Sequence, residues 1–347
     1  MNEVSTASPS SQHEWRFIIS SIGVLLVLLL VGSFFIDMKQ IAGVILRANW
    51  MMLVVGLMLF LAGIALIDYR WWRLLSKLPS FRRLIHATHV SFIVPILSPI
   101  PNIPVRVITT GVGTRVTIPQ ASTAIMVERM IAQIMRIIAF ILAVMLGAQA
   151  ELNPGSLLRS FVLAVVLMAL FLLAVRHYEK IVGASDALLQ KTPFIKASWR
   201  KKMVGMVYEA LAYGGDMRQL VHATAVTLVM WALFFCFHLL VIRALPLDAP
   251  LQLQMTIAMG ALALTPPSAP AMLGIYHASM ILPMLALNLA PLDVLLPYSL
   301  LLWGIQAVVW MVLTFWGLRM LDMHFVDLFR ISQEFDVVED LELESTF

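Results

Sequence analysis

The residues of this chain that are able to do chemistry are charged side chains set in apolar sequence. Arg129 and Arg136 lie in a long apolar run that also holds Glu128, and Arg106 lies in the stretch "SFIVPILSPIPNIPVRVITT", residues 91–110. An arginine carries a permanent, planar cation whose N–H groups form paired hydrogen bonds with carboxylate or phosphate oxygens. These residues therefore predict the binding of an anion in an apolar environment.

The spacing around Arg129 predicts one polar face on a helix. Steps of four, three, four and three residues place side chains on one side, and these are Ser122, Met126, Arg129, Gln133 and Arg136. At about 1.5 Å per residue from Gln120, Arg129 lies about 13 Å into an apolar core about 30 Å thick. A cation there costs at least about 3 kcal/mol, so it needs a partner or a wet cavity. The two hypotheses are a bound phosphate and a structural pair with Glu128, while Arg136 is near enough to the far interface to snorkel.

The segment before Arg106 is broken by prolines. Pro95, Pro99, Pro101 and Pro104 lie within ten residues, and proline interrupts a straight helix. In lipid, such backbone survives only where protein or a water-filled cavity covers it, and a half-helix beginning there presents N–H groups to a phosphate. The alternatives are a structural kink for the segment and snorkelling to the headgroups for Arg106.

Composition predicts an integral membrane protein. Of the 347 residues, 61% are hydrophobic and 13% are charged, and the mean hydropathy is +0.90. Six apolar runs reach the roughly 20 residues that a spanning helix needs, and they are 15–36, 49–69, 120–147, 156–176, 219–243 and 294–318. Prolines interrupt two further apolar stretches, 84–111 and 251–290. The expected fold is all-α and polytopic, with about six full spans and two broken-helix hairpins.

Basic residues predict the orientation. Arg70, Arg73 and other basic residues follow the second run, and more fill the linker 177–218. Basic loops favour the cytoplasm, which places both termini there and makes the hairpins 84–114 and 251–290 re-entrant from opposite faces. The breaks also resemble each other, as "LSPIPNIP" and "LTPPSAP". This pattern predicts an inverted repeat around a site near the membrane midplane.

The chain is expected to have five segments. They are a polar N-terminal segment 1–14, a first membrane half 15–176, a cytoplasmic linker 177–218, a second membrane half 219–325 and an acidic tail 326–347. Apolar residues recur at helical spacing among the basic residues of the linker, which predicts an amphipathic helix on anionic headgroups. An ordinary connecting helix is the alternative.

Other reactive residue types give weaker signals. His86 and His89 are three residues apart, which suits a metal, but no third ligand is apparent and an interfacial position is favoured. His222 and His238 occur singly in apolar runs and are interpreted as core residues with hydrogen-bond partners. Cys236 is the single cysteine, which excludes an intrachain disulfide. No nucleophile elbow or phosphate-binding glycine loop occurs, so no cofactor is expected and enzyme chemistry has little support.

Four short motifs resemble those of the flippase-like superfamily, which comprises the transmembrane region of lysylphosphatidylglycerol synthase and its stand-alone relatives. They are "YRWWRLL" at the end of the second run, "PVRV" at Arg106, "IMVERM" with Glu128 and Arg129, and "LGIYHAS" with Tyr276 and His277. The resemblance covers about residues 15–325. It implies translocation of lipid between leaflets, with Arg106 and the Glu128–Arg129 pair as family positions.

The chain departs from the family at two acidic positions. Ile103 and Pro104 stand where the family usually has Gly-Glu, and His277 stands where it has a glutamate after the second break. Protonation of His277 adds positive charge to the cavity, so lipid binding is expected to strengthen toward acidic pH.

The expected function is ATP-independent binding or flipping of an anionic phospholipid or a polyprenyl-phosphate lipid, in a bacterial cytoplasmic membrane. The expected substrate-binding residues are Arg106, Glu128, Arg129, Gln133, Tyr276, His277 and Gln306. The alternatives are a membrane-embedded enzyme or accessory subunit of lipid or glycan synthesis, and a structural membrane protein. A second copy of the chain or a biosynthetic protein is the expected protein partner. The net charge of +4 is modest and lies in loops, so nucleic acid is not expected as a partner.

Overall fold

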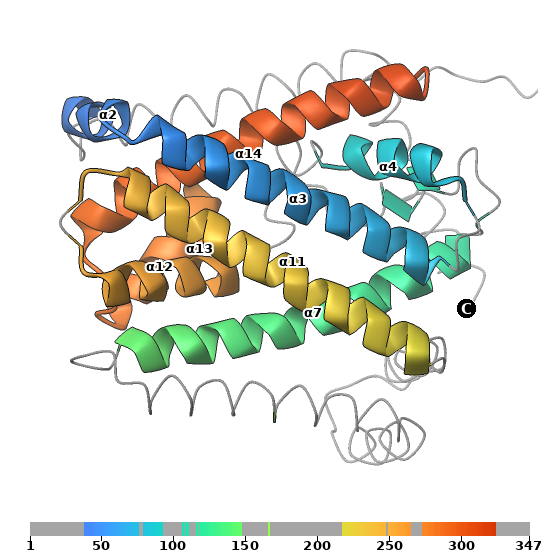
Figure 1. Cartoon of the computed structure of the whole chain (residues 1–347), viewed down its shortest axis with the longest axis horizontal. Helices are drawn as coiled ribbons and strands as arrows, with labels where there is room; N and C mark the ends of the chain where they lie inside the picture. The colour runs from blue at the N-terminus through green and yellow to red at the C-terminus, as the bar shows by residue number, and fades with distance from the viewer. Residues whose placement is uncertain are drawn as a thin grey trace, which may run out of the picture.

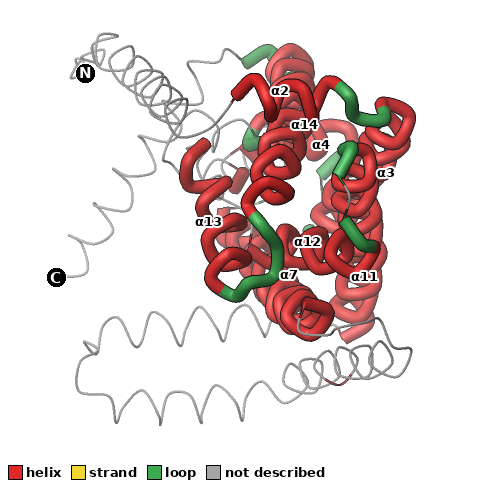
Figure 2. Tube along the Cα trace, turned by 90° about the vertical axis from the view of Figure 1, so that its left-hand side faces the viewer, coloured by secondary structure: helices red, strands yellow, loops and turns green. Residues whose placement is uncertain are grey.

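The structure, a computed structural model, describes residues 38–75, 79–92, 106–107, 109–110, 116, 118–147, 166, 217–247, 249–264 and 273–323. These residues form helices and a few short loops, and contain no strand (Figure 2). The helices are α2 (Met38–Leu46), α3 (Trp50–Leu74), α4 (Phe81–Val90), α7 (Ile118–Gly147), α11 (Met217–Ala244), α12 (Leu251–Leu264), α13 (Leu273–Ala286) and α14 (Leu292–Met320). The all-α prediction is therefore confirmed for the described part of the chain.

Four helices are long and apolar enough to cross a membrane, namely α3, α7, α11 and α14. They correspond to the second, third, fifth and sixth predicted spans. Large apolar side chains such as Val54, Met58 and Val312 are exposed on them, as lipid-facing positions require. The predicted spans 15–36 and 156–176 lie outside the described residues, apart from one residue, as do the N-terminal segment, nearly all of the linker and the acidic tail.

The helices α3 and α11 pack against each other along their length. Asn49 caps α3, because its side-chain Oδ1 accepts hydrogen bonds from the backbone N–H groups of Met51 and Met52 at 3.1 and 3.3 Å. Further along α3, the ring of Phe234 on α11 occupies the space that a side chain at Gly63 would need. Small residues at such positions allow membrane helices to approach closely.

The long helices run in two directions. At one end of the bundle, the N–H of Asn49 donates to the carbonyl of Ala244 at 2.7 Å. At the other end, the Gln219 side chain donates to the carbonyl of Arg73 at 2.6 Å. These contacts make α3 and α11 antiparallel, and Figure 1 shows that α7 runs with α11 whereas α14 runs with α3. The predicted order of six spans requires these same relative directions.

The helices α12 and α13 are too short to cross a membrane, as are the still shorter α2 and α4. Both α12 and α13 have 14 residues, or about 21 Å, against a hydrocarbon core of about 30 Å. Gln252 at the start of α12 donates to the carbonyl of Leu146 near the end of α7 at 2.7 Å. Figure 1 shows the end of α13 at this same end of the bundle, whereas α4 lies toward the opposite end beside α14. The proline-rich breaks at 93–105 and 265–272 lie outside the described residues, so their re-entrant course stays a prediction.

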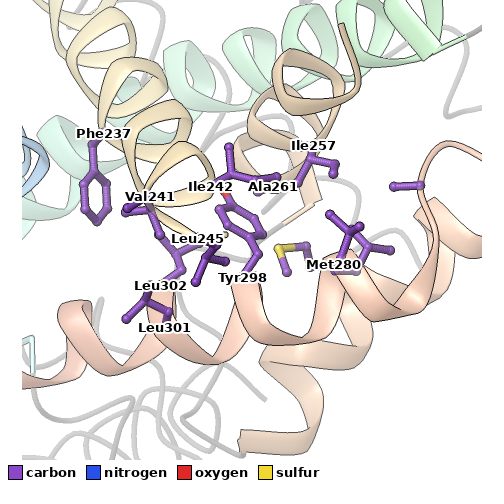
Figure 3. Close-up of a cluster of buried hydrophobic side chains, with 14 of the residues drawn as sticks. Phe237, Val241, Ile242, Leu245, Ile257, Ala261, Met280, Tyr298, Leu301 and Leu302 are labelled. Atoms are coloured by element: carbon purple, nitrogen blue, oxygen red, sulfur yellow. The ribbon is translucent and has the colours of Figure 1, made fainter. Parts of the chain in front are cut away.

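A hydrophobic core joins α11, α12, α13 and α14 (Figure 3). Phe237 stacks on Phe60 of α3 with ring centroids 4.7 Å apart. Next to it, buried His238 shares a hydrogen bond with the hydroxyl of Tyr298 at 2.7 Å. His222 likewise shares one with the Tyr69 hydroxyl at 3.2 Å. The interpretation of these two histidines as hydrogen-bonded structural residues is confirmed, although His222 is only half-buried.

Candidate functional site

Three charged side chains meet inside the helix bundle and form what we call the charge cluster: Arg70, Arg106 and Glu128. Oε1 of Glu128 accepts from Nη2 of Arg70 at 2.8 Å and from Nη1 of Arg106 at 3.1 Å. The three residues are only 2%, 7% and 8% exposed. Buried charges need compensation by opposite charge and hydrogen bonds, and one carboxylate here serves two arginines.

Different elements supply the members of the charge cluster. Glu128 lies ten residues after the start of α7, or about 15 Å along the helix. Arg70 lies in the last turns of α3, and its Nη1 also donates to the hydroxyl of Thr227 on α11 at 2.7 Å. That hydroxyl donates in turn to the Ala223 carbonyl at 2.7 Å. Arg70 therefore connects α3 to both α7 and α11.

The guanidinium of Arg106 is held in a defined orientation. Its central carbon lies 4.3 Å from the ring centroid of Trp71, a cation–π contact with a fully buried indole. Its Nη1 donates a hydrogen bond to Oε1 of Glu128. Its Nε and Nη2, which together form the side edge of the planar group, are buried and have no hydrogen-bond partner among the described residues. That edge presents two parallel N–H donors, the geometry that binds two oxygens of a phosphate or a carboxylate.

The position of Arg106 overturns one alternative from the sequence. Snorkelling to the headgroups is wrong, because the side chain is buried and pairs with Glu128. Oε1 of Glu128 accepts from Arg70 and Arg106, two partners beyond the Arg129 of the predicted structural pair, and that pair stays an alternative. Arg129 and Arg136 are half-buried and have interactions of their own, whereas Gln133 is exposed.

A second ionisable pair lies beside the charge cluster. Nε2 of His89 on α4 donates to Oδ2 of Asp68 on α3 at 2.9 Å, and both residues are buried. The backbone around His89 is fixed as well, because its carbonyl accepts from the Thr314 hydroxyl of α14 at 2.8 Å. The Thr109 hydroxyl donates to the carbonyl of Ala87 at 3.1 Å, which connects the segment after Arg106 to α4.

The polar residues of α13 and α14 form a group separate from the charge cluster. The hydroxyl of Tyr276 on α13 donates to Oε1 of Gln306 on α14 at 3.2 Å, and both residues are buried. His277 is half-buried, with its ring 6.4 Å from that of Trp303. Within the described residues, no hydrogen bond or ion pair joins this group to the charge cluster. The structure thus brings together Arg106 with Glu128, and Tyr276 with Gln306, as two sets.

With this geometry established, comparison with known proteins places the chain. The sequence profile of a family described as the lysylphosphatidylglycerol synthase TM region matches residues 18–321. The chain belongs to this family. The match covers both polar groups and confirms the resemblance predicted from the four motifs. None of the curated proteins and none of the solved structures gives a significant match.

Within this family domain, several site residues escape sequence reasoning. The interpretation of Arg70 as a charge of a cytoplasmic loop is wrong, because Arg70 lies inside α3 and is 2% exposed. His86 and His89 are both buried between helices, and their predicted interfacial depth stays a prediction. No group of three metal-ligating side chains occurs among the described residues. The sequence does carry one signal: Trp71, Trp72 and Leu74 continue the apolar run past Asp68 and Arg70, which places these charges inside the span.

Proposed function

We propose that this protein binds the anionic headgroup of a phospholipid or polyprenyl-phosphate lipid inside the membrane and moves the lipid between leaflets without ATP. The observation that carries the proposal is the buried Nε–Nη2 edge of Arg106, which has no partner among the described residues. Unsatisfied charged donors in a low-dielectric interior are costly. A phosphate with two oxygens toward that edge removes the cost.

The charge cluster is suited to an anion because its cations exceed its anions. Arg70 and Arg106 share the single carboxylate of Glu128, which leaves one positive charge in the cluster. The ring of Trp71 covers the face of Arg106 and directs ligand binding to its edge. We assign Arg129, which follows Glu128 directly, and Gln133, on the next turn of α7, as further headgroup ligands. Tyr276, His277 and Gln306 are assigned as polar residues along the lipid path.

The membrane arrangement that fits this function is an inverted repeat with two re-entrant hairpins. Its support is the shortness of α12 and α13, and the location of α4 toward the opposite end of the bundle (Figure 1). Irregular backbone at the breaks then lines a polar cavity, as in other transporters built from broken helices. The proposed location is a bacterial cytoplasmic membrane with both termini on the cytoplasmic side.

A structural role is the competing candidate, because the same ion pairs connect α3, α7 and the segment at Arg106. The variant that separates the two functions is Arg106→Lys. Lysine keeps a cation beside Glu128 and Trp71 but lacks the Nε–Nη2 edge. Loss of charge-assisted hydrogen bonds worth about 1.5–3 kcal/mol lowers lipid affinity about ten- to hundredfold.

The experiment measures transfer of fluorescent phosphatidylglycerol and of a polyprenyl phosphate between leaflets of proteoliposomes. The matched control is Arg243→Lys, at an exposed position in the last turn of α11. We expect both variants to keep native thermal stability and only Arg106→Lys to lose transfer. Full transfer by stable Arg106→Lys refutes the phosphate site. Absence of transfer by the native protein with either lipid refutes transport and leaves the structural role.

A further inference from the structure

The Asp68–His89 pair has no role in the proposed function, although it lies beside the charge cluster. Both residues are buried, at 3% and 4% exposed, and come from different helices. Their hydrogen bond of 2.9 Å uses Oδ2 of the carboxylate and Nε2 of the ring. The two outer atoms, Oδ1 of Asp68 and Nδ1 of His89, are buried and have no hydrogen-bond partner in the described part of the chain.

These outer atoms are where the pair accepts a proton. Because an ionised carboxylate only accepts hydrogen bonds, Nε2 of His89 carries the proton of the 2.9 Å contact. In the neutral ring, Nδ1 then holds a free lone pair. A hydronium ion of the solvent transfers its proton to Nδ1: an N–H bond forms, an O–H bond of the hydronium breaks, water leaves, and the ring becomes an imidazolium beside the Asp68 carboxylate.

Charged groups on several elements act on this pair. Arg106 and Glu128 lie close enough to Asp68 to influence its charge. Arg70 belongs to the same helix as Asp68, and Arg129 follows Glu128 on α7. His86 lies one turn before His89 on α4, with its ring against Trp316 of α14. A change of charge at Arg106 is therefore felt by a titratable pair that water does not screen.

We propose that the Asp68–His89 pair is a proton-binding site linked to the headgroup site, so that binding an anionic lipid takes up a proton from solution. The inference rests on the proposed function, because the anion at Arg106 is what favours the imidazolium. A negative charge near the pair stabilises its protonated form, and by linkage protonation strengthens anion binding to the same extent.

The contacts around the Asp68–His89 pair connect it to the segment that carries Arg106 and to α14. The Thr109 hydroxyl fixes the segment after Arg106 to Ala87 of α4, and the Thr314 hydroxyl fixes His89 to α14. At Gly317 of α14, an added side-chain carbon would lie 2.8 Å from the carbonyl oxygen of His86, so the two helices approach closely. A charge change at His89 therefore acts on a packed junction of three elements.

The proposal predicts that lipid affinity depends on pH. If one proton enters with each lipid, lipid affinity falls about tenfold for each unit by which the pH rises, over the range in which lipid binding brings the proton in. The probe is dihexanoylphosphatidylglycerol, because its phosphodiester does not titrate near neutral pH, with dihexanoylglycerol as the uncharged blank. Calorimetry in buffers of different ionisation enthalpy counts the protons taken up by the full-length protein in detergent.

Three variants locate the proton. His89→Gln keeps a donor to Asp68 but accepts no proton, and Asp68→Asn keeps an acceptor but removes the stabilising charge. The matched control is His222→Gln, whose ring bonds to Tyr69 on another face of α3. We expect about one proton per lipid in the native protein and the control, and none in the other two variants.

The outcomes separate failure of the proton site from failure of the proposed function. Binding to the native protein without proton uptake overturns the proton site and leaves the proposed function standing, whereas no binding at any pH removes both. The native protein alone gives this answer, so it holds even where a variant fails to fold. Uptake that persists in His89→Gln overturns the assignment to His89, and the further variant His86→Gln then tests the other buried histidine of α4.

Discussion

Replacement of Glu128 by glutamine tests the charge cluster most directly. The side chain keeps its size and an oxygen that accepts hydrogen bonds, but it loses the charge that Arg70 and Arg106 share at 2.8 and 3.1 Å. Two buried cations then remain without their counter-ion. The comparison variant is Arg106→Leu, which leaves the pair of Arg70 with Glu128 intact.

The magnitude follows from the two distances. At an effective dielectric constant of about 20, each contact contributes about 5–6 kcal/mol before desolvation and the unfolded state are subtracted. Measured losses on removing one partner of a buried ion pair are about 3–5 kcal/mol. Since Glu128 serves two partners, we expect Glu128→Gln to lose at least about 4 kcal/mol of unfolding free energy, and Arg106→Leu clearly less.

The purified protein is unfolded in mixed micelles by increasing amounts of a denaturing detergent, and tryptophan fluorescence follows the transition. This experiment measures the loss of unfolding free energy for both variants under the same conditions. Trp71, one of the nine tryptophans of the chain, lies against Arg106 and contributes to this signal. If Glu128→Gln is as stable as the native protein, or loses less than Arg106→Leu, the shared counter-ion role assigned to Glu128 is refuted.

Two further substitutions test the packing. Gly317→Ala places a carbon 2.8 Å from the backbone oxygen of His86, so it should destabilise the protein by about 1–3 kcal/mol. Gly304→Ala is the control, because no atom of a neighbouring element lies within 4 Å of the added carbon, and it should leave the melting temperature unchanged. If Gly317→Ala melts at the same temperature as Gly304→Ala, the close approach of α4 and α14 is contradicted. Tyr298→Phe leaves buried His238 without its 2.7 Å partner and should lose about 1–3 kcal/mol, measured by thermal unfolding. A variant as stable as the native protein shows that this hydrogen bond contributes nothing.

Much of the fold follows from sequence alone. The second, third, fifth and sixth apolar runs correspond to α3, α7, α11 and α14, and the relative directions of these helices agree with the predicted order of spans. The end of α3 was misjudged, because the run was closed at residue 69 and Arg70 was given to a loop. A charge next to an apolar run looks like a loop residue unless a partner inside the bundle is known.

The candidate site was predictable in part. Arg106 and Glu128 stand out because a charge in an apolar segment is costly wherever it lies. Their contact was not predictable, because Arg106, Arg129 and Arg70 are all plausible partners of one carboxylate. The contact of His89 was not predictable for the same reason: its partner Asp68 lies 21 residues earlier on another helix.

The sequence by itself determined that this is an all-helical membrane protein of the lysylphosphatidylglycerol synthase TM region family. Spanning length and apolar composition are local properties, since hydrocarbon demands them of each segment separately. Only the tertiary structure decided which charges meet. The packing of α3, α7 and the segment at Arg106 brings two arginines to one oxygen of Glu128. The packing of α3 with α4 buries Asp68 against His89. A pattern along one helix does not contain those contacts, because they result from packing between segments far apart in the chain.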